Sequence, residues 1–341
     1  LIEEIGRTPH MGMQYAIHSP LLRDAVYDNL LTNQRIAYHL KAAEYLETLP
    51  APEIAGGYDG LLAYHYRGAG NQKKELFYTL LAADRAKSIY ANNEALQHYN
   101  RSLELLDHLQ RNTQSADEIR HLQTERFEVL NDRRQVLHLL GKLKASQQDA
   151  EALLPLAKEM WDDEVWMIDA LLAQYDHIPD STEELNNGLN TVREACRIAQ
   201  KIGDKHREML SLVRLTNFLF SLRDYSAHDT ANHALALARE LGDIKTEVSL
   251  LIRISQTFGL DDLARNREYL QAALSKSESL NDKAIELSLL EGLSHQFERQ
   301  GDYFTQLTQY EQKRLALSRE IGNRLAEGNA LNNCGQIQAL Y

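Results

Sequence analysis

The chain has 341 residues, of which 43% are hydrophobic, so it is long enough for two ordinary domains or one long repeat array. Its 37 basic and 49 acidic residues give a net charge of −12, which argues against non-specific binding to nucleic acid or anionic membranes. The scarcity of proline, glycine and β-branched runs favours an all-helical chain, with only six prolines and seventeen glycines.

The two cysteines, Cys196 and Cys334, lie far apart and within helical patterns, so they do not indicate a disulfide framework. No apolar run approaches the roughly 20 residues needed to span a bilayer, and no signal-peptide pattern is present. We therefore expect a cytoplasmic location. The sequence starts without a methionine and ends within a helical pattern, so we expect it to be a piece of a longer protein.

Residues 1–50 carry no repeat. The alternating segment Met13–His18 predicts a short strand or extended stretch, and Ser19-Pro20 predicts a helix start. Six apolar residues follow on one helix face: Leu21, Leu22, Ala25, Val26, Leu30 and Leu31. A second helix is expected over about 34–49, and prolines and glycines between 50 and 57 end it.

Helices then follow one another with short breaks. We predict them over 61–69, 73–88, 92–109, 116–140 and 143–160. Regular pairs come next, 163–177 with 181–202, 205–222 with 226–241, 244–258 with 262–280, and 283–299 with 303–321, before a single helix over 324–341.

The breaks between pairs recur at a nearly constant interval. They fall at Trp161, Gly203, Gly242, Asn281 and Gly322, which are 42, 39, 39 and 41 residues apart. A period near 40 with two helices per period is typical of a helical solenoid.

Counting from each break separates the helix faces. The position nine residues on is apolar and is expected to be buried: Ala170, Leu212, Leu251, Leu290 and Leu331. The positions twelve and sixteen residues on share that face; they include Cys334 and His177. The position thirteen residues on is mostly small, as expected where two helices approach closely: Gln174, Thr216, Ser255, Ser294 and Gly335.

The repeats resemble the tetratricopeptide repeat. Gly301-Asp302-Tyr303 followed by Tyr310 carries the resemblance, as does the first clear pair with Ala83, Ala95, Tyr99 and Ser102. The units depart from that pattern by running to about 40 residues, and Arg314 stands where a small residue normally packs. The resemblance implies an all-α superhelix of antiparallel helix pairs, which we expect over 56–341 as six to seven pairs with the last one truncated.

Residues 15–47 resemble the segment that joins the ATPase module to tetratricopeptide repeats in large bacterial signalling ATPases of the STAND type. The matching residues are Tyr15, His18, the run Arg23–Tyr27, Leu30-Leu31, Arg35 and His39. The resemblance implies that residues 1–55 are the tail of a winged-helix, ATPase-linking segment. Some such proteins carry an adenylate or guanylate cyclase domain and others are transcriptional regulators, and any catalytic domain would lie upstream of this chain.

The sequence shows no catalytic, cofactor-binding or metal-binding constellation. The glycine cluster 55–60 lacks a following GK[ST], and the thirteen histidines form no ligand motif. The acids after Trp161 favour the N-terminus of the next helix through its dipole. We therefore expect no enzyme activity in this chain.

One column indicates a binding surface. In a tetratricopeptide superhelix the position fourteen residues after each break faces the inner groove, and here it holds only hydrogen-bonding side chains: Tyr175, Asn217, Gln256, His295 and Gln336. One helical turn before this position, ten residues after each break, the side chains are apolar in the earlier repeats and polar in the last two, Glu291 and Asn332. Such a groove suits an extended peptide or a partner helix. The alternative is that these side chains bridge helices or are simply solvated.

These observations leave two functions open. The first is a protein- or peptide-binding sensor scaffold of a multidomain signalling ATPase, with no nucleic-acid or membrane contact and with self-association through the repeats left open. The second is the regulatory arm of a transcriptional regulator that binds a small inducer.

Overall fold

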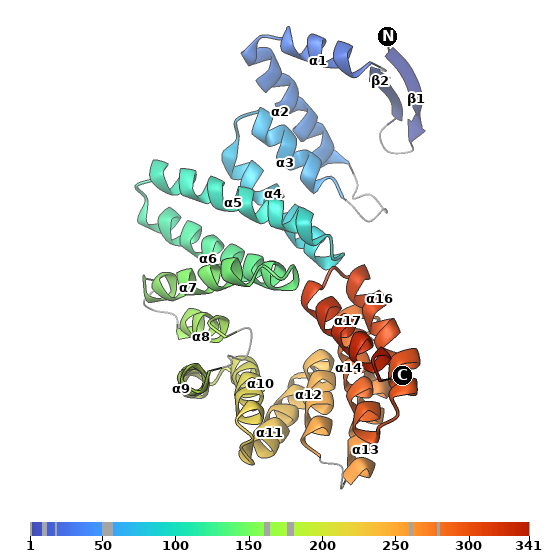
Figure 1. Ribbon diagram of the computed structural model, residues 1–341. Coiled ribbons are helices and arrows are strands. Elements are labelled where there is room, and N and C mark those ends of the chain that lie inside the picture. The colour runs from blue at the N-terminus through green and yellow to red at the C-terminus, as the bar shows by residue number, and fades with distance from the viewer. Residues whose placement is uncertain are drawn as a thin grey trace. The chain divides into compact units, whose positions relative to one another are not determined.

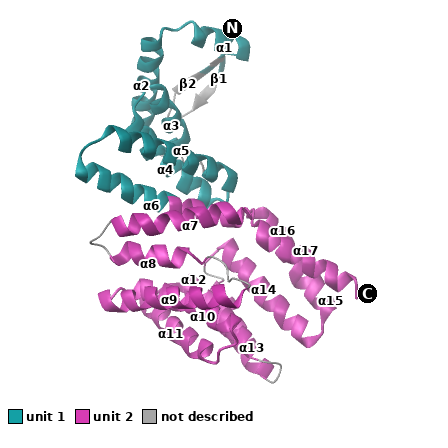
Figure 2. Cartoon of the chain, turned by 60° about the vertical axis from the view of Figure 1, so that its left-hand side comes forward, with its two compact units in different colours: residues 1–129 teal, residues 130–341 magenta. Residues whose placement is uncertain are grey.

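The computed structural model describes residues 2–8, 12–17, 19–49, 57–159, 164–175, 181–258, 262–277 and 280–340. Helices make up most of this described chain, as the sequence predicts (Figure 1). The chain divides into two compact units, residues 1–129 and residues 130–341 (Figure 2). The predicted domain boundary at 55/56 falls inside the first unit and stays a prediction.

The first unit begins with a β-hairpin. Strand β1 (Ile2–Thr8) pairs antiparallel with β2 (Gly12–Ile17), with an irregular register between Glu4 and Gly6. The predicted extended segment corresponds to β2, whereas His18 lies outside the described residues. Strand β1 was not predicted, because Ile2 and Ile5 are three residues apart and the register irregularity interrupts the alternation that marks a strand.

Two helices follow the hairpin as predicted. Helix α1 (Pro20–Asp28) starts at Ser19, whose hydroxyl accepts a hydrogen bond from the Leu22 amide. Helix α2 (Thr32–Thr48) packs against α3 (Asp59–Gly68) through Ala43, Leu46 and Tyr66. The apolar face of α1 is open instead of buried, with Leu21 83% exposed.

Helices α4 (Gln72–Ser88) and α5 (Asn92–Asn112) form the first clear pair, and α6 (Ala116–Leu139) follows them. The four residues that carry the tetratricopeptide resemblance in this pair are all buried: Ala83, Ala95, Tyr99 and Ser102. The three small ones, Ala83, Ala95 and Ser102, let the two helix backbones approach.

The second unit continues as helix pairs whose ends agree with the predicted ones to within a few residues. Its helices are α7 (Leu143–Glu159), α8 (Glu164–Ala173), α9 (Thr182–Ile202), α10 (Lys205–Ser221), α11 (Ser226–Leu241), α12 (Ile244–Thr257), α13 (Leu263–Ser277), α14 (Lys283–Gln300) and α17 (Arg324–Gln338). Neighbouring helices share a continuous apolar core that includes Met209, Leu251 and Leu270.

The breaks that define the period are helix joints. Gly203, Gly242 and Gly322 adopt positive φ values of 75°, 69° and 67°, which only glycine takes without strain. The residue after each break accepts a hydrogen bond from the first turn of the next helix, as Asp243 does from the Thr246 amide at 3.0 Å. Trp161, the first predicted break, lies outside the described residues.

The helix predicted over 303–321 is present, but its middle is π-helical. It consists of α15 (Tyr303–Thr305), a π-helical segment η2 (Gln306–Glu311) and α16 (Gln312–Glu320). The wider π turn directs Gln306 and Glu311 to the same buried partner, the Ser294 hydroxyl on α14.

The predicted buried columns are confirmed at about half of their positions, and several others, such as Leu290 and Leu293, are half-buried. Leu212 and Leu251 are buried in the apolar column, and Thr216, Ser255 and Ser294 are fully buried in the small column. The prediction fails on α17, where Leu331 is 46% exposed and Gly335 is exposed, because no described helix covers that face. His177 lies outside the described residues.

Candidate functional site

Consecutive repeats form a pocket between α12 and α14. Positions seven, ten and fourteen residues after the breaks lie on one face of each helix, because these spacings correspond to whole helical turns. The pocket measures about 200 Å³ and is lined by Ser249, Ile252, Arg253, Gln256, Ser288, Glu291 and His295. The structure thus brings together three predicted site residues: Gln256, Glu291 and His295.

A second pocket adjoins the first, because Gln256 lines both. It measures about 560 Å³ and is lined by Phe220, Arg223, Asp224, Tyr225, Ala227, His228, Gln256, Thr257, Phe258 and Arg265. The rings of Phe220 and Phe258 supply apolar surface. This larger pocket lies at the α10–α11 joint and the end of α12, and Arg265 of α13 also lines it.

Arg253 lies in the smaller pocket and has a neutral hydrogen-bond partner. Its Nη1 donates to the side-chain oxygen of Gln256 at 2.9 Å, and its guanidinium lies 5.6 Å from the centre of the Phe220 ring. Burial lowers the pKa of Arg253, and the nearby charge of Glu291 partly offsets this effect.

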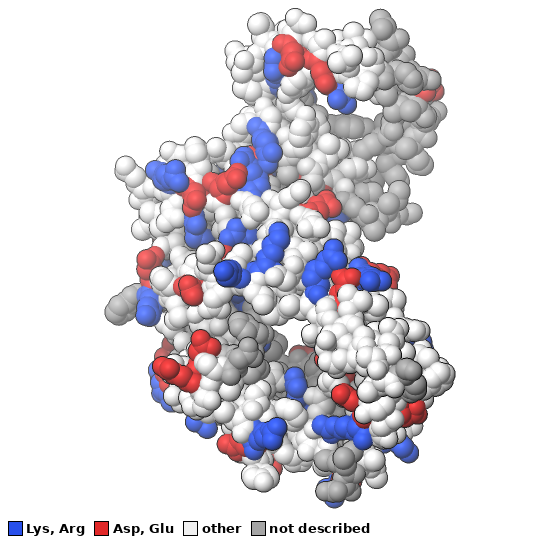
Figure 3. Space-filling model, viewed as in Figure 1, with Lys and Arg blue, Asp and Glu red and all other residues white. Residues whose placement is uncertain are grey.

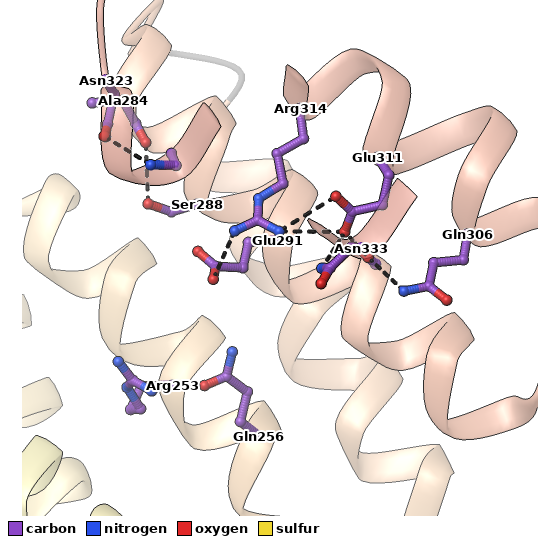
Figure 4. Close-up of polar contacts among 12 residues, drawn as sticks. Arg253, Gln256, Ala284, Ser288, Glu291, Gln306, Glu311, Arg314, Asn323 and Asn333 are labelled. Carbon is purple, nitrogen blue, oxygen red and sulfur yellow. Dashed lines mark hydrogen bonds and ion pairs between the residues drawn. The ribbon is translucent and has the colours of Figure 1, made fainter. Parts of the chain in front are cut away.

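Glu291, on the opposite wall of the pocket, is held by another arginine. Arg314 is only 2% exposed and lies 3.0 Å from Glu291 and 3.3 Å from the fully buried Glu311 (Figure 4). Glu311 also accepts hydrogen bonds from Ser294 and, at 3.1 Å, from Asn333. The residue that departs from the tetratricopeptide pattern, Arg314, is therefore the centre of a buried ion pair behind the pocket.

The other predicted residues do not reach this pocket. Tyr175 lines a separate pocket of about 590 Å³ with residues of α7 and α9, and its ring meets Phe218 edge-on at 5.5 Å. Asn217 is half-buried on α10, whereas Asn332 and Gln336 are exposed on α17. The five residues of the predicted column therefore do not line one continuous site. Only Gln256 and His295 lie in the pocket between α12 and α14.

Sequence reasoning missed Arg253. Its signal in the sequence is a single basic residue inside the apolar run Leu250–Ile254. Comparison of equivalent positions across the repeats did not reveal it, because the position eleven residues after the break is not basic in every repeat.

An ion pair that recurs at the helix joints was also not predicted from the sequence. A side chain three residues before the break pairs with a glutamate five residues after it, as in Arg67–Glu75, Arg239–Glu247 and Arg319–Glu327, at 2.8, 2.8 and 2.9 Å. The constant spacing of eight residues is visible in the sequence. Because each pair joins the helices on either side of a break, we assign these residues to the fold and not to a ligand.

The described residues show little sign of other chemistry. They contain no group of three potential metal ligands, and no helix among them is long and apolar enough to cross a membrane. Burial raises the pKa of the Cys196 thiol, which disfavours the reactive thiolate.

Comparison of the sequence with models of known protein families gave no match, and comparison with curated proteins gave none either. Among solved structures, the chain resembles a Rap protein complexed with Competence and Sporulation Factor, with a TM-score of 0.56 and 13% identity over 91% of this chain and 85% of that one. It also matches a Signal Transduction ATPase with Numerous Domains (STAND) protein with a tetratricopeptide repeat sensor from Pyrococcus horikoshii, with a TM-score of 0.45 and 14% identity. That match covers 94% of this chain but only 56% of the other. At these identities the likeness concerns the fold alone: the chain has an all-α, tetratricopeptide-like helical-repeat fold.

Proposed function

We propose that this chain is an interaction module that binds an extended peptide or a partner helix along the first helices of its repeats. The observation that supports this proposal is a pair of adjoining pockets that share Gln256, one between α12 and α14 and one at the α10–α11 joint beside the end of α12. Side chains such as Gln256 and His295 can hydrogen-bond a peptide backbone, while Phe220 and Phe258 offer apolar surface to its side chains. The Rap protein of similar fold was solved in a complex with Competence and Sporulation Factor, which is consistent with this use of the fold.

We further propose that the module is the sensor of a larger cytoplasmic signalling ATPase of the STAND type. The support is the resemblance of residues 15–47 to the segment that joins ATPase and repeats in those proteins. Partner binding would shift the ATPase only through a difference in affinity for its two states. The test is the coding sequence before Leu1, where we expect a P-loop within several hundred residues; its absence would refute this part of the proposal.

The binding surface is tested with random heptapeptides displayed against the immobilised chain. We expect enriched peptides to lose affinity for the variant Asn217→Ala/Gln256→Ala/His295→Ala, while its melting temperature stays near that of the wild type. A matched control replaces Asn332 and Gln336, which are exposed on α17 and outside the two pockets, and should retain binding. The proposal fails when no peptide is enriched, or when enriched peptides bind the triple variant unchanged.

A second candidate function is binding of a small inducer by a regulatory arm. The 560 Å³ pocket with two aromatic rings favours it, because small-molecule sites commonly measure 300–1,000 Å³. A metabolite that raises the melting temperature of the wild type, and loses this effect when Phe220 or Phe258 is replaced by leucine, would favour this candidate over the peptide.

We propose no catalysis by this chain. Turnover of a substrate by the isolated chain would overturn that view.

A further inference from the structure

We propose that the pocket between α12 and α14 binds a carboxylate of the peptide ligand, and that Arg253 is the residue that anchors it. This inference rests on the proposed function and names the chemical group by which the ligand is held. The carboxylate belongs either to an aspartate or glutamate side chain or to the C-terminus of the peptide.

The first support is the environment of the Arg253 guanidinium. Its hydrogen bond goes to the neutral amide oxygen of Gln256, its face lies over the Phe220 ring, and its neighbours on the pocket wall include Ile252 and Ser249. A cation removed from water without an anionic partner is costly, and a carboxylate that enters the pocket would remove that cost. Within the described residues, Arg253 forms no ion pair.

Other partly buried arginines of the same unit differ from Arg253 in this respect. Arg207 forms a two-pronged ion pair with Asp169, at 2.9 and 2.8 Å, and Arg133 forms one with Asp149, at 2.8 and 2.6 Å. Each of these pairs joins two helices. Arg253 has no such structural partner among the described residues, which leaves its guanidinium available for a ligand.

The second support is the position of Glu291, the carboxylate nearest to Arg253 on the pocket wall. Figure 4 shows its carboxylate directed to Arg314, which lies 3.0 Å away, while Arg253 and Gln256 stand on the neighbouring helix. Arg314 is in turn fixed by Glu311, and Glu311 by Ser294 and Asn333. Glu291 is therefore engaged by Arg314, and although its charge acts on Arg253 it forms no ion pair with it among the described residues.

The third support is the size and polarity of the pocket. Its 200 Å³ is several times the roughly 30 Å³ that one water molecule occupies in the liquid, so it admits the end of a side chain or of a peptide. The Gln256 amide and the His295 ring nitrogen supply additional hydrogen-bond donors near Arg253. These groups suit a carboxylate, which accepts several hydrogen bonds.

The charge of the whole chain makes such an anchor specific. The net charge is −12, and acidic and basic side chains are interspersed over the face seen in Figure 3. An acidic peptide gains no general attraction from such a surface. Preferential retention of a carboxylate thus requires a local, partly desolvated cation such as Arg253.

The test uses fluorescent random heptapeptide pools and the full chain. Pools with one fixed aspartate or glutamate are compared with pools carrying asparagine or glutamine at the same position, and pools with a free C-terminus with amidated ones. We expect the wild type to bind one of the acidic sets about tenfold or more tightly than its amide counterpart, as for a hydrogen bond to a charged group. The pair of pools that shows the preference identifies which carboxylate is bound.

Two variants assign the preference to Arg253. Arg253→Gln should abolish it and leave binding of the amide pools, whereas Arg253→Lys should retain part of it. The matched control is Arg197→Gln, which removes an exposed arginine of α9 that pairs with Glu194 and lines neither pocket, and should leave the preference unchanged.

The outcomes separate this inference from the proposed function. Equal binding of acidic and amide pools by the wild type overturns the carboxylate anchor while the peptide-binding function survives. A preference that persists in Arg253→Gln overturns the assignment to Arg253. Absence of binding by every pool refutes both proposals.

Discussion

Arg314 brings a charge into a helix interface that tetratricopeptide repeats usually fill with a small residue. Its side chain is almost completely buried and lies between Glu291 and the fully buried Glu311. The Nε atom of Arg314 and the side-chain oxygen of Gln306 have no hydrogen-bond partner among the described residues. The network therefore specifies one arrangement of α14, η2 and α16 at a cost in stability.

Removal of one partner from this network should be strongly destabilising. Glu311→Ala leaves the Arg314 charge buried with only the partly exposed Glu291, and we expect a loss of about 3–5 kcal/mol in the free energy of unfolding. The double variant Glu311→Leu/Arg314→Met removes both charges and should recover most of that loss. Urea denaturation of the two variants beside the wild type measures both effects, and an equal loss in both would contradict the ion-pair explanation.

A second residue-scale feature lies in the first unit, where His39 and His65 share a hydrogen bond. Their Nδ1 atoms are 3.0 Å apart, and His39 Nε2 lies 2.8 Å from the Tyr27 hydroxyl. A bond between two Nδ1 atoms needs one protonated and one unprotonated nitrogen, so double protonation breaks it. Burial lowers the pKa of both rings, and the charge of His39 lowers the pKa of His65 further.

The first unit should therefore lose stability in mild acid. The unfolded histidines take up protons near pH 6.5 and the folded ones only at lower pH, so the unfolded state binds more protons in between. The stabilisation from the two neutral histidines is complete above about pH 6.5, and it is lost as the pH falls through their lowered pKa values in the folded state. Melting curves between about pH 7.5 and 5 should show a steeper decline for the wild type than for His65→Gln; parallel declines would refute the prediction.

At the scale of elements, helix packing determines whether replacing a glycine inside a helix by alanine lowers or raises stability. Gly188 lies within α9, where an added Cβ would stand 2.4 Å from the ring of the fully buried Phe218 and 3.0 Å from Tyr175. Gly328 lies within α17, where an added Cβ meets nothing within 4 Å. The same substitution should thus have opposite effects at the two sites.

Gly188→Ala should lower the free energy of unfolding by about 1–3 kcal/mol, because overpacking outweighs the better helix propensity of alanine. Gly328→Ala should raise it by up to about 1 kcal/mol, since only the propensity changes. Denaturant titration of both variants gives the comparison. Stabilisation by Gly188→Ala would show that α9 and α10 pack less closely than the structure indicates.

At the scale of the molecule, the second unit is a stack in which each helix pair packs on its neighbours. One apolar core spans residues of α8 to α11, and another links α9 to α14. In a repeat array of this kind, stability is approximately a sum of local terms, so a defect is felt most strongly by adjacent repeats.

Hydrogen exchange measured by mass spectrometry tests this expectation. Gly188→Ala should increase amide exchange in α8 to α11 well before it affects α16 and α17. Gly328→Ala, which creates no clash, serves as the control and should not increase exchange in either region. A uniform increase across the second unit would mean that the unit opens as one cooperative body.

Local sequence patterns predict the helices, their joints and the repeat period of about 40 residues. These features depend on local physical chemistry: an amphipathic period of 3.6 residues, a glycine or asparagine at the helix end, and an acidic or amide cap after it. The same counting placed Gln256, Glu291 and His295 on one face, and the structure brings them to one pocket.

Which side chains meet across repeats depends instead on how the helices pack. Arg314 pairs with Glu291, which lies 23 residues earlier in the chain. The π turn that directs Glu311 to Ser294 leaves no mark in the helical periodicity of the sequence. Glu291 lies on the wall of the same pocket as Arg253, yet its ion pair is with Arg314 of α16. Ion-pair partners depend on the register of packed helices, which the spacing of residues within one helix does not specify.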